Sequence, residues 1–136
     1  MIKAIISDIQ GVLVDTADGF DINTELIEFL IKNKKDYGLL LLYSNLGVQS
    51  VESVKKIVPK LFDHVDGEYY ASNVKYIKPD VRGFKEILNI WGLEPSEVIF
   101  IDDNQSNIKA AESLGIGVVH YEDLGDISTL NSLLYP

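Results

Sequence analysis

Three apolar runs constrain the fold of this chain more than any other feature, because polar residues follow each of them at once. The runs cover residues 2–6, 39–43 and 98–101. Each is continuous or nearly so, and each is far shorter than a membrane-spanning segment. Continuous apolar runs of this length are typical of strands that are covered on both faces, as in parallel sheets. We therefore expect a buried, mainly parallel sheet.

Helical patterns alternate with these runs. Apolar residues recur at helical spacing in four segments, which we expect to be helices at 23–35, 48–58, 81–91 and 104–114. A fourth strand is expected at 116–121, and a closing helix from Ile127. Strands that alternate with helices favour a parallel sheet with helices on both faces. We predict a three-layer, Rossmann-like α/β fold of four or five strands, in one domain over residues 1–136.

The composition excludes several classes of function. The 136 residues carry a net charge of −9, whereas a nucleic-acid surface needs a basic stripe. The chain has no cysteine, which excludes disulfides, thiolate catalysis and cysteine-based zinc sites. We expect no signal peptide and no membrane segment, and a cytoplasmic protein.

Carboxylates follow two of the expected strands. Asp8 comes after the first apolar run, and Asp102 and Asp103 come after the third. The carboxyl ends of parallel strands share one edge of a sheet, which is where open α/β sheets bind ligands. Clustered carboxylates repel one another unless a cation lies among them. Oxygen ligands without nearby histidine or cysteine favour Mg²⁺.

A second polar set suits a phosphate group. Ser44 and Asn45 follow the second strand, just before the helix expected from Val48. A hydroxyl and unpaired amides at such a turn can bind phosphate oxygens. Lys78 can reach the same place as a point charge. We therefore expect a phosphorylated substrate.

Four motifs occur in order along the chain. They are Asp8 to Leu13, Ser44-Asn45, Lys78-Pro79-Asp80, and Phe100 to Asp103 with Asn107, Ala110-Ala111 and Gly115-Ile116. Each motif alone is weak. Together, in this order and structural context, they resemble the haloacid dehalogenase-like superfamily of phosphohydrolases over essentially the whole chain.

The resemblance implies roles in phosphoryl transfer. Asp8 resembles the nucleophile that takes the phosphoryl group as an aspartyl-phosphate. Ser44 resembles the residue that hydrogen-bonds the transferred oxygens, with Asn45 beside it. Lys78 resembles the cation that steadies the nucleophile and the charge of the transition state.

The resemblance also implies Mg²⁺ as the cofactor. The ligands would be Asp8, the backbone carbonyl of Gln10, and Asp103. Asp102 would bind the ion directly or through water, and the sequence leaves both arrangements open.

Gln10 departs from the family pattern, which has an aspartate as general acid and base at this position. An amide can hydrogen-bond a leaving oxygen, but it cannot shuttle a proton, and such proton transfer contributes roughly 10²–10⁴-fold to rate. Two hypotheses follow. The chain is a Mg²⁺-dependent phosphatase acting through Asp8, or an impaired relative that binds Mg²⁺ and phosphate ligands or serves as a dimeric binding module.

The intervals between the motifs are too short for a cap domain. An open site of this kind suits a large substrate, or a homodimer in which a second subunit supplies the lid. A phospho-acceptor domain of the response-regulator type would also use clustered aspartates and a lysine. Its acidic pair is expected on the first strand, whereas Asp102 and Asp103 end a late one.

Overall fold

A computed structural model describes the structure of residues 1–15, 21–121 and 127–136 of the protein. A sheet of five parallel strands forms its centre, in the order β5-β4-β1-β6-β7. The strands are β1 (Ala4–Ser7), β4 (Leu39–Tyr43), β5 (Gly67–Tyr69), β6 (Val98–Asp102) and β7 (Gly117–His120). The predicted parallel sheet is therefore confirmed.

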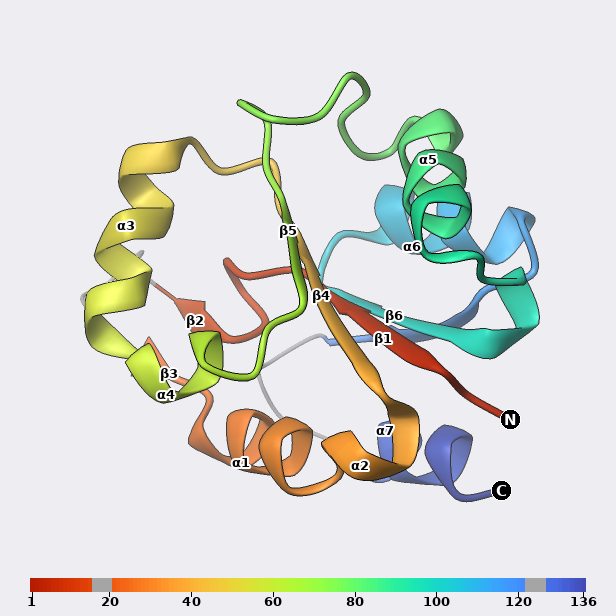
Figure 1. Ribbon diagram of the computed structural model, residues 1–136, viewed down its shortest axis with the longest axis horizontal. Coiled ribbons are helices and arrows are strands. Elements are labelled where there is room, and N and C mark those ends of the chain that lie inside the picture. The colour runs from red at the N-terminus through yellow and green to blue at the C-terminus, as the bar shows by residue number, and fades with distance from the viewer. Residues whose placement is uncertain (16–20, 122–126) are drawn as a thin grey trace.

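Helices cover both faces of this sheet (Figure 1). One face packs against α1 (Thr24–Lys32), α2 (Lys34–Tyr37), α3 (Val48–Ile57), α4 (Pro59–Phe62) and α7 (Ile127–Leu134). The other face packs against α5 (Val81–Trp91) and α6 (Gln105–Ser113). A short 3₁₀ turn, η1 (Pro95–Glu97), precedes β6. This is the expected three-layer arrangement.

The two faces explain why the apolar runs are continuous. Along β6, Ile99 and Ile101 belong to one hydrophobic core, whereas Val98 and Phe100 belong to the other. Alternate residues of a strand point to opposite faces, so both sets must be apolar when both faces are covered. Burying a side chain of this kind stabilises the fold by about 1.5–3 kcal/mol.

Local signals set several of the helix boundaries. The side chain of Asn23 accepts a hydrogen bond from the backbone N–H of Leu26 and begins α1. Gly92 ends α5 in a left-handed conformation, with φ +64°. The helix expected at 23–35 is interrupted at Asn33, so α2 is a separate turn. Pro59 ends the preceding helical segment and also begins α4.

A small hairpin lies beside the end of β1 and was not predicted. Its strands, β2 (Val14–Asp15) and β3 (Asp21–Ile22), pair antiparallel, where the sequence indicated a loop over residues 11–20. Residues 16–20 of that loop lie outside the described part of the chain. Two-residue strands are too short to give a periodic pattern. Within the described ranges there is no cap domain, and no helix there is long and apolar enough to cross a membrane.

Candidate active site

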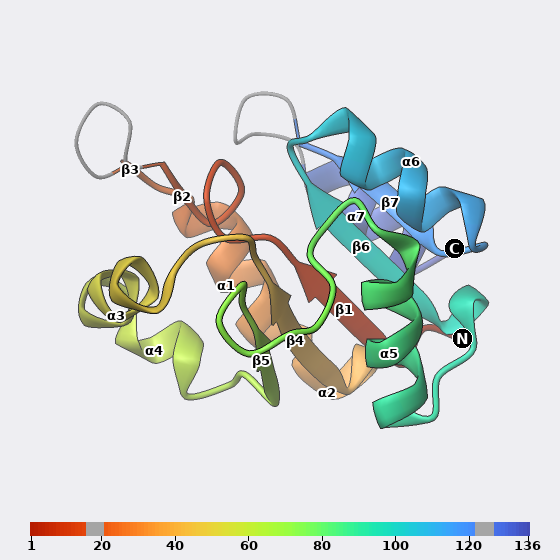
Figure 2. The same ribbon diagram turned by 90° about the horizontal axis from the view of Figure 1, so that it is seen from above.

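The strand order places Asp8 between the ends of two neighbouring strands. The last residue of β1, Ser7, pairs with Leu42 of β4 on one side and with Ile101 of β6 on the other. The backbone N–H of Asp8 then donates to the carbonyl of Ile101 at 2.9 Å. Figure 2 shows the segments that follow β1, β4 and β6 leaving the sheet at the same edge, where these strands end. Residues far apart in sequence therefore meet at this edge.

A cavity of about 270 Å³ opens at this edge. Its lining contains all seven predicted site residues together with three others: Asp8, Gln10, Ser44, Asn45, Lys78, Asp102, Asp103, Leu46, Asn104 and Asn107. The structure thus brings the four motifs to one place.

Lys78 lies between two carboxylates in the cavity wall. Its ammonium nitrogen is 2.7 Å from Oδ2 of Asp102 and 3.1 Å from Oδ1 of Asp8, and its side chain is only 1% exposed. The aromatic rings of Tyr43 and Phe100 lie beside it, with centroids 5.4 Å and 5.5 Å from the nitrogen. A buried ammonium in such surroundings is held by its ion pairs and by the ring faces.

Asn45 holds the backbone of Lys78. Its amide nitrogen donates to the carbonyl of Lys78 at 3.0 Å, and its amide oxygen accepts from the N–H of Lys78 at 3.2 Å. This pair of bonds fixes the loop that carries the lysine against the end of β4. The sequence predicted a phosphate contact for Asn45 and gave no sign of this second role.

Asp102 is fully buried and has three hydrogen-bond donors. Besides Lys78, the backbone N–H of Asn104 donates to its Oδ1 at 2.9 Å, and the amide of Asn107 donates to its Oδ2 at 3.0 Å. Burial alone would raise the pKa of Asp102, but the charge of Lys78 and these hydrogen bonds outweigh it and lower the pKa. The carboxylate of Asp102 is therefore kept ionised.

The pKa values of Asp8 and Asp103 are shifted in the opposite direction, upward. Burial raises the pKa of Asp8 to about 7, with Lys78 opposing this and Asp102 adding to it. Burial and the nearby carboxylate of Asp102 also raise the pKa of Asp103. One oxygen from each of the three carboxylates lies within 4.8 Å of the others. Such a cluster concentrates negative charge at a point where a cation would be stabilised.

Ser44 directly follows the end of β4 and is 1% exposed. Its backbone N–H donates to the carbonyl of Tyr69 at 2.9 Å, which ties it to β5. Its hydroxyl oxygen accepts from the N–H of Leu46 at 3.1 Å. The hydroxyl is thus held at the cavity wall, where its own hydrogen can be donated to an anion.

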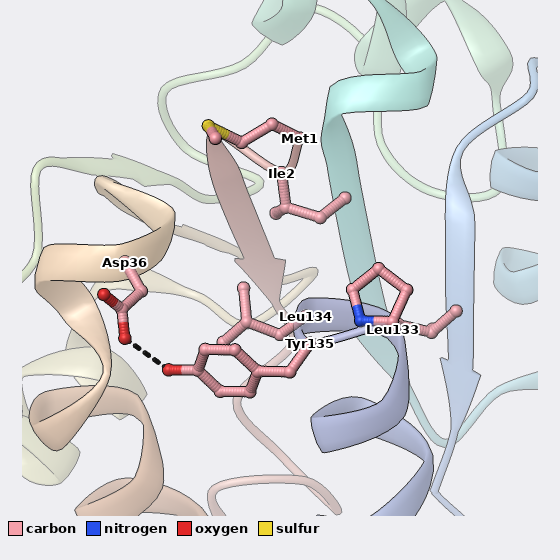
Figure 3. A pocket seen from close by; sticks show the side chains of 7 residues that line it. Met1, Ile2, Asp36, Leu133, Leu134 and Tyr135 are labelled. Carbon is pink, nitrogen blue, oxygen red and sulfur yellow. Dashed lines mark hydrogen bonds between the residues drawn. The ribbon is translucent and has the colours of Figure 1, made fainter.

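A larger cavity, of about 460 Å³, lies at the opposite edge of the sheet, beside the start of β1. Its lining is mostly apolar and comes from Met1, Ile2 and the last residues of the chain (Figure 3). The carboxylate of Asp36 accepts a hydrogen bond from the hydroxyl of Tyr135 at its rim. Among its lining residues, no group of carboxylates, lysine and hydroxyl converges, so we assign the chemistry to the smaller cavity.

The sequence model of the haloacid dehalogenase-like hydrolase family matches residues 22–115. This chain belongs to that family. The matched segment begins in β3 and ends after α6, so it includes Ser44, Lys78 and the acidic pair 102–103.

Solved structures of this family share the fold. A predicted hydrolase from Porphyromonas gingivalis has a TM-score of 0.85 at 19% identity and covers 100% of this chain and 99% of its own. A family enzyme from Bacteroides thetaiotaomicron, solved in complex with magnesium and inorganic phosphate, has a TM-score of 0.78 at 21% identity, covering 96% and 99% of the two chains. At these identities the likeness shows the fold alone.

Two curated relatives are more similar in sequence than these structures, over a part of their length. Mouse acyl-CoA dehydrogenase family member 10 is 41% identical over 80 residues, which is 58% of this chain and 7% of that protein. The chloroplast flavin mononucleotide hydrolase 1 of Arabidopsis thaliana is 35% identical over 51 residues, or 38% of this chain and 21% of that protein. The aligned part is therefore a small fraction of these relatives.

Proposed function

We propose that this haloacid dehalogenase-like chain is a Mg²⁺-dependent phosphatase that forms an aspartyl-phosphate at Asp8. The observation that carries the proposal is the buried set of Asp8, Lys78 and Asp102, which lines one cavity together with Ser44. A carboxylate beside an ammonium, a second ionised carboxylate and a hydroxyl make up the groups that phosphoryl transfer uses for attack and for charge stabilisation.

The donor set at this edge fits a hard divalent cation. Three carboxylates, from Asp8, Asp102 and Asp103, meet within 4.8 Å, and Gln10 lines the same cavity. Oxygen ligands of this type suit Mg²⁺, and the backbone carbonyl of Gln10 would complete the protein ligands. When bound, the ion would neutralise part of the negative charge of the phosphoryl group.

The proposed reaction has two displacements at phosphorus. In the first, an oxygen of Asp8 bonds to phosphorus while the bond to the leaving oxygen breaks. The leaving oxygen takes the electron pair and then accepts a proton from water. In the second, a water molecule attacks phosphorus, which releases Asp8 as a carboxylate, inorganic phosphate and a proton. This splits one difficult hydrolysis into two easier steps.

The remaining residues would stabilise the negative charge that develops on the phosphoryl group in the transition state. The hydroxyl of Ser44 would donate to a phosphoryl oxygen, and the backbone at Asn45 lies beside it. The ammonium of Lys78, 3.1 Å from Asp8, would orient the nucleophile and then stabilise the transferred oxygens. The substrate is a phosphate monoester whose leaving group extends out of the site at the uncapped edge of the sheet. This open edge has room for a large leaving group or for a second subunit of a homodimer.

The test is hydrolysis of 4-nitrophenyl phosphate with and without Mg²⁺, in the unmodified protein and in Asp8→Asn. We expect turnover that requires Mg²⁺ and that falls to background in Asp8→Asn, because an amide is a poor nucleophile. Asp63→Asn is the matched control, since this exposed residue at the end of α4 lies outside the cavity lining and undergoes the same chemical change. Turnover that persists without metal and in Asp8→Asn would refute the mechanism.

Gln10 favours a second candidate function. With an amide in the place of the family's acid and base, the chain would bind Mg²⁺ and phosphate without appreciable turnover. This hypothesis predicts binding of inorganic phosphate in calorimetry, no measurable hydrolysis, and a gain of activity in Gln10→Asp. Rapid hydrolysis by the unmodified protein would contradict it.

A further inference from the structure

The segment that carries Lys78 is tied to β4 at a second point. The hydroxyl of Tyr43, the last residue of β4, donates to the carbonyl of Tyr76 at 2.8 Å. Asn45, two residues after Tyr43, holds both backbone polar groups of Lys78. The residues on either side of Ser44 therefore anchor this segment at positions 76 and 78.

The ring of Tyr43 is itself held in place by its neighbours. It is fully buried, and its centroid lies 5.4 Å from the ammonium nitrogen of Lys78. The ring of Phe84 packs edge-on against Tyr43, with centroids 5.3 Å apart, and against Phe100, with centroids 4.9 Å apart. Phe100 is the second ring beside the ammonium. Because protein interiors are close-packed, this row of three rings leaves the hydroxyl of Tyr43 little freedom to move.

A glycine in α5 makes room for this hydroxyl. A Cβ atom at Gly83 would lie 2.0 Å from the hydroxyl oxygen of Tyr43 and 2.8 Å from the carbonyl oxygen of Tyr76. A methyl group cannot occupy that position unless the hydroxyl or the carbonyl moves. The close contact therefore accounts for a residue that is otherwise unfavourable inside a helix.

We infer that Tyr43 is a positioning residue for Lys78. Its hydroxyl anchors the segment through Tyr76 and thereby keeps the ammonium of Lys78 aligned with the nucleophile. This inference rests on the proposed function, in which that ammonium orients Asp8 and stabilises the transferred oxygens. The ion pairs of Lys78 define where its side chain ends, whereas the backbone anchors define where it starts. A shift of about 1 Å in a catalytic group can cost a large part of the rate.

A second buried tyrosine provides the matched control. Tyr43→Phe removes the hydroxyl and keeps the ring. Tyr37→Phe makes the same change in a residue at the end of α2, outside the lining of the site, whose hydroxyl donates to the carbonyl of Leu30 at 2.6 Å. Both variants lose one buried hydrogen bond to a backbone carbonyl, so we expect similar shifts of the urea unfolding midpoint. Gly83→Ala disturbs the contact of Tyr43 from α5 and leaves every ring in the chain unchanged.

Hydrogen exchange measures the anchor without any turnover. The backbone N–H of Lys78 donates to Asn45, so this amide is protected while the segment stays in place. We expect its exchange, followed by NMR, to be about threefold to tenfold faster in Tyr43→Phe and in Gly83→Ala than in Tyr37→Phe, as suits the loss of one hydrogen bond. Equal exchange at this amide in Tyr43→Phe and Tyr37→Phe would overturn the inference, whether or not the protein hydrolyses phosphate esters.

Hydrolysis of 4-nitrophenyl phosphate with Mg²⁺ tests the consequence for Lys78. We expect Tyr43→Phe to lower kcat by about threefold to tenfold with KM little changed, because a misplaced ammonium loses interactions made in the transition state. Tyr37→Phe should keep the rate of the unmodified protein. Tyr43→Phe combined with Gly83→Ala should be no worse than the more affected single variant, since both break one contact.

The two measurements separate this inference from the proposed function. Faster exchange at the amide of Lys78 together with an unchanged kcat would overturn the inference. Absence of hydrolysis in the unmodified protein would count against the proposed function alone, and the exchange rates would then decide whether Tyr43 holds Lys78 in place.

Discussion

A methyl group at position 11 tests whether the carboxylate of Asp103 holds a metal ion. Gly11 has φ +79°, and a Cβ atom there would lie 2.1 Å from Oδ2 and 2.7 Å from Cγ of Asp103. No side chain tolerates these distances, so Gly11→Ala must push the carboxylate away from its present position. The backbone carbonyl of Gln10, the residue before Gly11, is another proposed ligand of the same ion.

Two separate effects of this substitution can be estimated. A side chain at positive φ costs about 1–2 kcal/mol of folding free energy. The displaced carboxylate is the end of a flexible, exposed side chain, so moving it adds little to that cost. Loss of a correctly placed ligand should instead weaken Mg²⁺ binding by about 10-fold to 100-fold, the range found when the support of a metal ligand is removed.

Gly115→Ala is the matched control for the backbone effect. Gly115 has φ +92°, and a Cβ atom there would lie 3.6 Å from the nearest atom, on Pro95, which is ordinary contact. Urea unfolding should show similar losses in the two variants, while calorimetric titration with Mg²⁺ should show a loss only in Gly11→Ala. Equal Mg²⁺ affinity in both variants would refute the assignment of Asp103 as a ligand.

Two further predictions concern the charges around the site. Lys78→Met leaves Asp8 and Asp102 buried without their cation. Urea unfolding without metal should therefore show a free energy of unfolding that is lower by about 3–5 kcal/mol, and added Mg²⁺ should restore part of it. An unchanged unfolding midpoint would contradict this prediction. In the metal-free protein, burial raises the pKa of Asp8 from 3.8 to about 7, so the stability that this group contributes is fully present below about pH 4 and is lost as the pH rises through 7. Since Mg²⁺ binds the ionised form, the rise in Tm on adding Mg²⁺ should be larger at about pH 8 than at about pH 5.5, and a larger rise at the lower pH would show the sign to be wrong.

The arrangement of the sheet and the position of the site were predictable from the sequence. The continuous apolar run at residues 39–43 predicted a strand covered on both faces, and it is β4 with those bounds. Parallel strands end at a common edge, so the apolar runs that end at Asp8 and Asp102 predicted that these residues would be neighbours. The ion pairs of both with Lys78 fit that expectation. These features follow from burial and from chain direction, which leave a clear pattern in the sequence.

The contacts that orient the site were not predictable in the same way. Asn107 donates to Asp102, Asn45 holds the backbone of Lys78, and Asp15 accepts from Gln10. Each of these depends on where a single polar side chain points, and a polar residue in a loop or first helical turn has no periodicity that reveals its partner. The hairpin that carries Asp15 was missed for the same reason, because its strands have two residues each.

The charge of the site bears on how an acidic chain would bind the proposed anionic substrate. When all three are ionised, the carboxylates of Asp8, Asp102 and Asp103, set against the ammonium of Lys78, leave two uncompensated negative charges at the edge of the sheet. A phosphate dianion would be repelled there, and the net charge of −9 offers no compensation from the rest of the chain. A divalent cation cancels these two charges, after which Lys78 and the hydroxyl of Ser44 can act on the phosphate. We therefore predict that phosphate binds to this site only when the cation is present. The raised pKa of Asp8 comes first from its burial, and the nearby charge of Asp102 adds to it.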